Sequence, residues 1–287
     1  MTTPWGFEDF DAHEDLHFIT NEECGLKAII AVHSTHLGPA AGGCRFWRYE
    51  DEAQAVTDAL RLSRGMSYKN AMAGLPVEDD EVGGDPGPHT SLGVFLGIKA
   101  AVRRALRKDS LSGLHIALQG AGSVATGVAL HAANEGARIS IADVHEDKAQ
   151  KLADACGGKV VGADEILSLE ADVLSPCALG AILTEESISA LNVPIVAGGA
   201  NNQLATAEDG KRLHARGILY APDYVINAGG IINVCIEYLR SGDASVVREK
   251  IEGTPQHLKQ IWAESAESGR DPASVADAMA QRLIGRG

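Results

Sequence analysis

Cysteine, aromatic residues and positive charge are all scarce in this chain of 287 residues. Only five cysteines are present and no two of them form a CxxC pair, so we predict neither a disulfide framework nor a thiolate metal site. A reducing compartment, the cytoplasm, fits this cysteine content. The formal net charge is −14, from 39 acidic and 25 basic residues, which disfavours binding to nucleic acid or to an anionic membrane. No apolar run approaches the roughly 20 residues of a transmembrane helix.

Glycine, by contrast, is abundant, with 32 residues, while aromatic residues make up only 5%. This combination favours tight turns and close approach of the backbone to a ligand over an aromatic-rich β-sandwich. A hydrophobic content of 45% and a charged content of 22% are ordinary for a globular protein, and the length is sufficient for two domains.

The pattern of the chain changes after an acidic, turn-rich connector at 74–88, GLPVEDDEVGGDPGP. Before it we predict a strand at 25–34 and a helix at 51–73. After it, a helix at 90–108 is followed by short β-branched runs that alternate with helical segments, and the tail at 229–285 is helical. The predicted strands of this region are 114–119, 138–143, 159–161, 172–175, 194–198 and 217–221. Such alternation predicts right-handed βαβ crossovers and a parallel sheet covered on both faces.

A dinucleotide-binding fingerprint lies between the first of these strands and the helix that follows it. Gly120, Gly122 and Ala125 match the pattern G-x-G-x-x-G/A. The first glycine permits the tight turn, the second lets a pyrophosphate approach the backbone, and the alanine allows close packing of helix on strand. Ser123 and Val124 open the helix, whose N-terminus favours the phosphates. The alternative is a glycine turn in a domain that binds no ligand.

Asp143 ends the next predicted strand, 23 residues after Gly120. A carboxylate in this place accepts hydrogen bonds from the ribose hydroxyls of the adenosine and repels a 2′-phosphate. The sequence therefore predicts NAD rather than NADP as the cofactor.

Eight segments carry a resemblance that runs in order over nearly the whole chain. They are GLKAIIAVH (25–33), LGPAAGGCR (37–45), LSRGMSYKNAMAGL (62–75), GDPGPHTSLGVFLGIKAA (84–101), LQGAGSVA (118–125), SPCALGAILTEE (175–186), VAGGANNQL (196–204) and APDYVINAGGIINV (221–234). With them the chain resembles the leucine/phenylalanine/valine dehydrogenase branch of the amino-acid dehydrogenases. The resemblance implies NAD-dependent oxidative deamination of an apolar L-amino acid, reversible as reductive amination of the 2-oxo acid. It also implies two domains with the active site in the cleft between them.

The resemblance assigns roles on the substrate side of this cleft. Lys69 matches the lysine that binds the substrate carboxylate, and we take it as the candidate catalytic residue too, although a lone helix lysine is ordinarily solvated. Gly42 and Gly43 match glycines beside the substrate. Ala41, Ile231 and Val234 match the residues that line the pocket for the substrate side chain. Because alanine is small, the pocket is expected to accept a bulky apolar side chain.

On the cofactor side, Asn202 and Asn227 match asparagines at the nicotinamide and the substrate, and Thr90 matches a threonine near the nicotinamide. Cys177 and Ala178 match a turn that covers the cofactor, where we interpret the cysteine as a packing residue.

One departure from the family pattern is large. The family continues from the AGL segment into a strand with a second lysine, the general acid/base for attack of water on the imine, and later reaches a catalytic aspartate. Here Leu75 runs almost directly into Asp85-Pro86, so several tens of residues are missing. Acidic residues of the connector could replace the missing general acid/base; they are Asp79, Asp80, Glu81 and Asp85. The alternative is that they form a solvated acidic loop without a catalytic role. Loss of the lysine is expected to impair deamination and leaves two alternatives open: an NADH-dependent imine reductase, or a non-catalytic NAD-binding homologue.

We therefore predict an α/β chain in which a doubly wound Rossmann sheet accompanies a smaller, truncated α/β substrate domain. The expected domains are 1–83 for substrate and oligomer contacts, 84–228 for NAD, and 229–287 as helices that pack back on the first domain. The expected partners are a small amino acid or 2-oxo acid and further copies of the same chain in a homo-oligomer, because a half-domain of this size is marginal alone.

Overall fold

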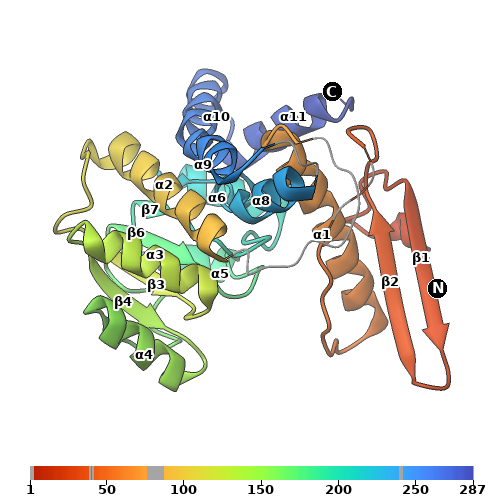
Figure 1. Cartoon of the computed structure of the whole chain (residues 1–287), viewed down its shortest axis with the longest axis horizontal. Helices are drawn as coiled ribbons and strands as arrows, with labels where there is room; N and C mark the ends of the chain where they lie inside the picture. The colour runs from red at the N-terminus through yellow and green to blue at the C-terminus, as the bar shows by residue number, and fades with distance from the viewer. Residues whose placement is uncertain (1–2, 39, 41, 76–86, 239–241, 287) are drawn as a thin grey trace.

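A computed structural model describes residues 3–38, 40, 42–75, 87–238 and 242–286. Its centre is a six-stranded parallel sheet (Figure 1). The strands are β3 (His115–Gln119), β4 (Arg138–Ala142), β5 (Lys159–Val160), β6 (Val173–Pro176), β7 (Ile195–Val196) and β8 (Leu219–Tyr220). They lie in the order β5-β4-β3-β6-β7-β8, the doubly wound order of a Rossmann domain. This confirms the fold class predicted from the alternation of strands and helices.

Helices cover both faces of the sheet, as the side-chain alternation of β3 shows. Ile116 and Leu118 enter a core shared with α2 (Gly87–Leu106), α3 (Ser123–Asn134) and α4 (Glu146–Cys156). Ala117 between them faces a second core, shared with α5 (Glu185–Ala190) and α6 (Ala207–Ala215). Burial on both faces explains why the strands are short, continuous apolar runs.

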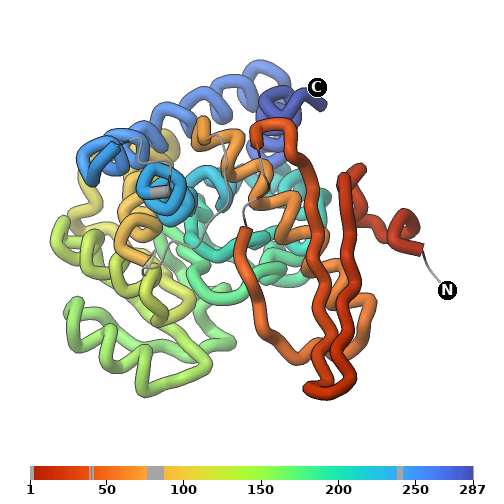
Figure 2. Tube along the Cα trace, turned by 45° about the vertical axis from the view of Figure 1, so that its right-hand side comes forward, coloured from red at the N-terminus to blue at the C-terminus, as the bar shows by residue number. Residues whose placement is uncertain are grey.

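The first 75 residues form a smaller unit beside the sheet. It consists of a short 3-10 helix, η1 (Pro4–Gly6), an antiparallel hairpin of β1 (Asp15–Asn21) and β2 (Leu26–Val32), and helix α1 (Glu52–Met72), which Asp51 caps by accepting from the Gln54 N–H. The hairpin stands on the outer side of α1 (Figure 2). Strand β1 was not among the predicted strands.

The C-terminal helices are α7 (Asp223–Ile226), α8 (Gly229–Tyr238), α9 (Ala244–Glu252), α10 (Thr254–Ser268) and α11 (Pro272–Leu283). Helix α10 is fixed to the sheet by the Trp262 indole N–H, which donates to the Tyr220 carbonyl at 3.0 Å. Helix α11 returns to α1, where Gln281 Nε2 donates to the Tyr68 hydroxyl at 3.0 Å. The domain boundaries near 83 and 228 remain a prediction. Among the described helices, none is long and apolar enough to cross a membrane.

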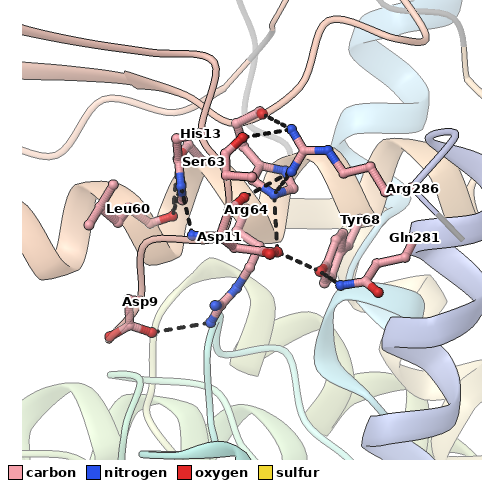
Figure 3. A network of polar contacts seen from close by, with 11 residues as sticks. Asp9, Asp11, His13, Leu60, Ser63, Arg64, Tyr68, Gln281 and Arg286 are labelled. Atoms are coloured by element: carbon pink, nitrogen blue, oxygen red, sulfur yellow. Dashed lines mark hydrogen bonds and ion pairs between the residues drawn. The ribbon is translucent and has the colours of Figure 1, made fainter. Parts of the chain in front are cut away.

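A polar network joins the two ends of the chain to α1 (Figure 3). The Arg286 guanidinium donates to the carbonyls of Asp11, Ala12 and His33 at 2.9, 3.0 and 2.6 Å. The Asp11 carboxylate accepts from the Tyr68 hydroxyl at 3.0 Å and lies 3.2 Å from His33 Nε2. These partners, His33 first, hold the pKa of Asp11 well below its ordinary value. Tyr68 directly precedes Lys69, so the network fixes the end of α1 that carries the candidate site.

Candidate active site

Helix α1 meets the sheet domain at Lys69. This side chain is buried, with 7% of the residue exposed, and its Nζ donates to Asn201 Oδ1 at 2.9 Å. Asn201 belongs to the loop after β7, at the carboxyl edge of the sheet, where ligands bind in open α/β sheets. Burial lowers the pKa of Lys69 to about 8, and the negative charge of Asp223 opposes that shift.

Asn201 connects Lys69 to Asn227, one of the predicted site residues. Asn227 Nδ2 donates to Asn201 Oδ1 at 2.9 Å and to the Gly199 carbonyl at 3.2 Å. An ammonium is only a donor, so Lys69 fixes the orientation of the Asn201 amide, which in turn fixes that of Asn227. Asn227 Oδ1 is then left buried without a partner among the described residues. It is an acceptor available to an N–H of a bound ligand.

Gly199 links this amide cluster to the predicted cofactor turn. Its N–H donates to Cys177 Sγ at 3.4 Å, and a Cβ built on it would lie 2.8 Å from Val124 Cγ1 at the start of α3. Burial raises the pKa of the Cys177 thiol, which agrees with our interpretation of this cysteine as a packing residue. The structure thus brings Val124, Cys177, Asn227 and Lys69 together around one loop.

The glycine-rich turn after β3 has the shape that a dinucleotide requires. Gly120 has φ +105°, and a Cβ there would lie 2.9 Å from the Cys177 carbonyl oxygen and 3.2 Å from Ala178 Cβ. Gly122 is the N-cap of α3 without a side-chain cap hydrogen bond, and a Cβ on it would meet nothing within 4 Å. Because Gly122 has no Cβ, a pyrophosphate can approach the backbone where the helix begins.

Asp143 is held beside this turn. Its Oδ2 accepts from the Ala121 N–H and its Oδ1 from the His145 N–H, both at 2.8 Å. Each carboxylate oxygen keeps a second acceptor site, so a ribose hydroxyl can still donate to it. The residues of this turn therefore fit a dinucleotide whose adenosine ribose carries a 2′-hydroxyl and no 2′-phosphate.

The remaining predicted residues lie next to α1, on α2 and on α8, or outside the described part of the chain. A Cβ on Gly42 would lie 3.8 Å from Met66 Cγ of α1, and Gly43 beside it is exposed. Thr90 Oγ1 accepts from the Gly230 N–H at 3.1 Å and so ties α2 to α8. Ile231 and Val234 are half-buried on α8. Outside the described residues lie Ala41, Asp79, Asp80, Glu81 and Asp85.

The loop 201–205 is held against one stripe of α1, at residues 61, 65 and 69. Arg61 donates to the carbonyls of Leu204 and Ala205 at 2.6 and 3.0 Å, and a Cβ on Gly65 would lie 3.3 Å from Asn202 Oδ1. The contact surrounds a cavity of about 10 Å³, room for about one water molecule. Its lining comprises Leu62, Gly65, Met66, Lys69, Asn201, Asn202, Asp223 and Tyr224. The two units are therefore closed on each other here.

Three residues of this site were not found from the sequence. The sequence pattern singles out Asn202 but not its neighbour Asn201. Nothing in the sequence distinguishes Arg61 from a solvated helix arginine, or Asp223 from an ordinary acid at the start of a helix. Asn202 itself lines the cavity, and its N–H donates to Asp223 Oδ2 at 2.7 Å. The doublet of asparagines was the one available signal, because asparagine tolerates the left-handed backbone that Asn202 adopts, with φ +52°.

Comparison with known proteins identifies the family. Residues 14–84 match the family described as "Glu/Leu/Phe/Val dehydrogenase, dimerisation domain", and residues 139–282 match "Glutamate/Leucine/Phenylalanine/Valine dehydrogenase". The chain belongs to the Glu/Leu/Phe/Val dehydrogenase family. It is therefore an oxidoreductase that acts on amino acids, in a family of NAD(P)-dependent enzymes.

Several members of the Glu/Leu/Phe/Val dehydrogenase family are similar over nearly their whole length. Leucine dehydrogenase of Bacillus subtilis is 37% identical over 340 aligned residues, which cover 97% of this chain and 93% of the relative. L-tryptophan dehydrogenase of Nostoc punctiforme is 38% identical over 330 residues, with 95% and 93% covered. The crystal structure of L-tryptophan dehydrogenase from Nostoc punctiforme superposes with a TM-score of 0.79 at 36% identity, with 95% of each chain covered.

The length of these alignments bears on the missing segment. An alignment of 340 positions exceeds the 287 residues of this chain, so the leucine dehydrogenase carries residues that have no counterpart here. That these residues are missing after Leu75 remains a prediction from the family pattern.

Proposed function

We propose that this dehydrogenase catalyses NAD-dependent oxidative deamination of an apolar L-amino acid and the reverse reductive amination. The observation that carries the proposal is the buried ammonium of Lys69 on Asn201 Oδ1, joined through Asn227 and Gly199 to the turn fitted for a dinucleotide. This arrangement supports a role for Lys69 in binding the substrate carboxylate close to the nicotinamide.

In this proposal, different residues bind the carboxylate, the amino group and the side chain of the substrate. Lys69 has three N–H donors and donates one to Asn201; within the described residues the other two remain available for the substrate carboxylate. Asn227 Oδ1 can accept an N–H from the substrate amino group or from a carboxamide. Leu62 and Met66 of α1 lie beside Lys69 and supply apolar surface next to it, which favours an apolar substrate. The contribution of Ala41, Ile231 and Val234 to the side-chain pocket remains part of this proposal.

NAD, when bound, supplies the hydride acceptor. Gly120, Gly122 and the amides that open α3 would hold its pyrophosphate, and Asp143 would hold its ribose. The Asp143 carboxylate disfavours a 2′-phosphate by charge repulsion, which is why we propose NAD and not NADP.

Imine reduction is a second candidate function, favoured by the segment that this chain lacks. Attack of water on an imine requires a general acid/base, which contributes about 10²–10⁴-fold in rate. Reduction of a preformed imine requires hydride transfer and binding but no attack of water. Lys69 is the only lysine among the residues that line the described cavity.

Absorbance at 340 nm separates these functions. The protein is mixed with NAD⁺ and L-leucine, L-phenylalanine, L-valine or L-tryptophan, and in parallel with NADH and either a 2-oxo acid plus ammonia or a cyclic imine. We expect NADH to form with at least one of the amino acids and to be consumed with its 2-oxo acid. Turnover with the cyclic imine alone would replace the first proposal by the second. Binding of NADH without turnover in any mixture would indicate a non-catalytic homologue.

We also propose that the chain forms a homo-oligomer through its first domain. We propose the cytoplasm as its compartment, because its cysteines form no disulfide. The β1–β2 hairpin exposes Phe18 and Ile30, with 57% and 50% of each residue accessible, and Trp47 between the hairpin and α1 in the chain is 61% exposed. Exposed apolar residues on a two-stranded sheet with free edges favour association. Sedimentation of the intact protein as a monomer would contradict this part of the proposal.

A further inference from the structure

Asp223, at the start of α7, is a buried carboxylate with two defined partners. Its Oδ2 accepts from the Asn202 N–H at 2.7 Å, and its Oδ1 accepts from the Tyr220 hydroxyl at 2.9 Å. Asn202 has the left-handed φ of +52°, a conformation that is unfavourable for most residues other than glycine and that asparagine tolerates. The short bond from its N–H to a carboxylate stabilises this conformation and holds the 201–202 turn in place.

The turn held by Asp223 is the one that presents Asn201 to Lys69. Asp223 and Lys69 line the same small cavity, so the carboxylate acts on the ammonium through the interior of the protein. The interaction is reciprocal, because Asp223 raises the pKa of Lys69 and Lys69 lowers that of Asp223, each against the effect of burial. The other titratable groups around Asp223 among the described residues are Tyr220 from β8, Tyr224 from α7 and Asp277 from α11.

We propose that Asp223 is a positioning residue of the amino-acid site: through the Asn202 N–H it fixes the turn that sets Asn201 on Lys69, and its buried charge is the counter-charge of the Lys69 ammonium. The proposal rests on the proposed function to the extent that Lys69 binds the substrate carboxylate. Asp223 itself touches neither substrate nor cofactor in this account. It acts through Asn202 and Lys69.

Asp277 provides a matched control. It is likewise an aspartate that accepts from a tyrosine, since the Tyr224 hydroxyl donates to Asp277 Oδ1 at 2.8 Å, and both residues of this pair are half-buried. Burial raises the pKa of Asp277 to about 6. It lies on α11, and no hydrogen bond joins it to the described loop 199–203. A purely structural effect of losing a buried carboxylate would therefore appear in both Asp223→Asn and Asp277→Asn.

The test is a pH titration of the Lys69 side chain by NMR, with lysines labelled with ¹³C at Cε and the Lys69 signal assigned from Lys69→Arg. We expect Asp223→Asn to lower the pKa of Lys69 by about one unit, whereas Asp277→Asn leaves it within about 0.3 unit. An unchanged titration in Asp223→Asn, or an equal shift in both variants, overturns the proposal. The readout requires no turnover, so it is decided independently of whether the protein deaminates amino acids.

A stability cycle covers the case in which Asp223→Asn does not fold alone. Removal of the carboxylate leaves an uncompensated buried ammonium, which is strongly destabilising. We expect the double variant Lys69→Met/Asp223→Asn to fold, and Lys69→Met to raise the melting temperature of Asp223→Asn by at least about 3 °C more than it raises that of the wild type. Lys69→Met should not rescue Asp277→Asn beyond its effect on the wild type. If Lys69→Met raises the melting temperature of Asp223→Asn no more than that of the wild type, Asp223 is not the counter-charge of Lys69.

Discussion

Nζ of Lys69 lies 2.9 Å from Oδ1 of Asn201, and this hydrogen bond joins a helix of the first 75 residues to the loop after β7 of the Rossmann sheet. The two residues are 132 positions apart in the chain. The hydrogen bond to a neutral amide does not neutralise the Lys69 ammonium, so its positive charge can attract the carboxylate of a ligand. The predictions below follow from this relationship and from the contacts around it.

Replacement of Lys69 by methionine should remove binding of the substrate carboxylate. Loss of one partner of a buried, hydrogen-bonded charge pair typically reduces binding by roughly 10²–10³-fold, so we expect the KM for the amino acid to rise by that factor. Affinity for NADH should stay within about threefold of the wild type, because the turn around Gly122 is untouched. Lys99→Met, which removes a lysine of α2 that pairs with Glu135 at the end of α3, is the control. An unchanged KM in Lys69→Met would remove the carboxylate assignment.

The stability of the protein should depend on pH through Lys69. Burial lowers the pKa of this group from 10.5 to about 8, so between these values the unfolded chain binds more protons than the folded one. The unfolding free energy attributable to Lys69 therefore rises with pH from about 8 to 10.5, by up to roughly 3 kcal/mol. Lys69→Met should be more stable than the wild type at pH 7, and the difference should shrink across that window. Urea unfolding at pH 7, 9 and 10.5 measures it; a difference that is constant with pH would contradict the assignment.

Arg61 should hold the two units closed over the site. It donates to the carbonyls of Leu204 and Ala205, next to the loop that carries Asn201. We expect Arg61→Ala to raise the KM for the amino acid by about tenfold, since hydrogen bonds from a charged group contribute about 1.5–3 kcal/mol. Arg64→Ala is the matched control, because this arginine of the same helix pairs with Asp9. Equal effects of the two variants on KM would show that Arg61 has no specific role in closure.

Replacement of Asp143 by serine should relax the preference for NAD. Removal of the carboxylate abolishes repulsion of the 2′-phosphate, so the ratio of kcat/KM for NADH to that for NADPH should fall by about tenfold or more. A modest loss of thermal stability should accompany the change, because the Ala121 N–H loses its acceptor. Asp147→Ser, at an exposed position in the first turn of α4, should leave the ratio unchanged. A ratio that does not move in Asp143→Ser would refute the ribose contact.

The Rossmann half of the fold could be predicted from the sequence because its strands are buried on both faces. Runs such as 114–119 then stand out as continuous apolar segments between helical ones. Strand β1 could not be found in this way. Leu16, Phe18 and Ile19 put apolar residues on both faces of an exposed hairpin, and the strand is specified by its pairing with β2 rather than by a one-sided alternation.

The site was predictable where a single residue type has a unique geometric role. Gly120 and Gly122 follow from the turn itself, and Asp143 from its place at the end of a strand. Which member of the asparagine doublet contacts Lys69 depends on the backbone: the positive φ of Asn202 leaves Asn201 facing the ammonium. Asp223 could not be recognised, because its partners are a backbone N–H and a tyrosine that only the folded chain brings to it.

The central claim is that this chain transfers hydride from an apolar L-amino acid to NAD although it lacks the segment with the second lysine. The most direct measurement is the first turnover, followed at 340 nm after rapid mixing of enzyme and L-leucine with excess NAD⁺. In deamination the hydride leaves before water attacks the imine, so we expect a burst of up to one NADH per subunit, followed by a slower steady rate. If no NADH forms in the first turnover with L-leucine, L-phenylalanine, L-valine or L-tryptophan, although NAD⁺ is bound, the account is contradicted.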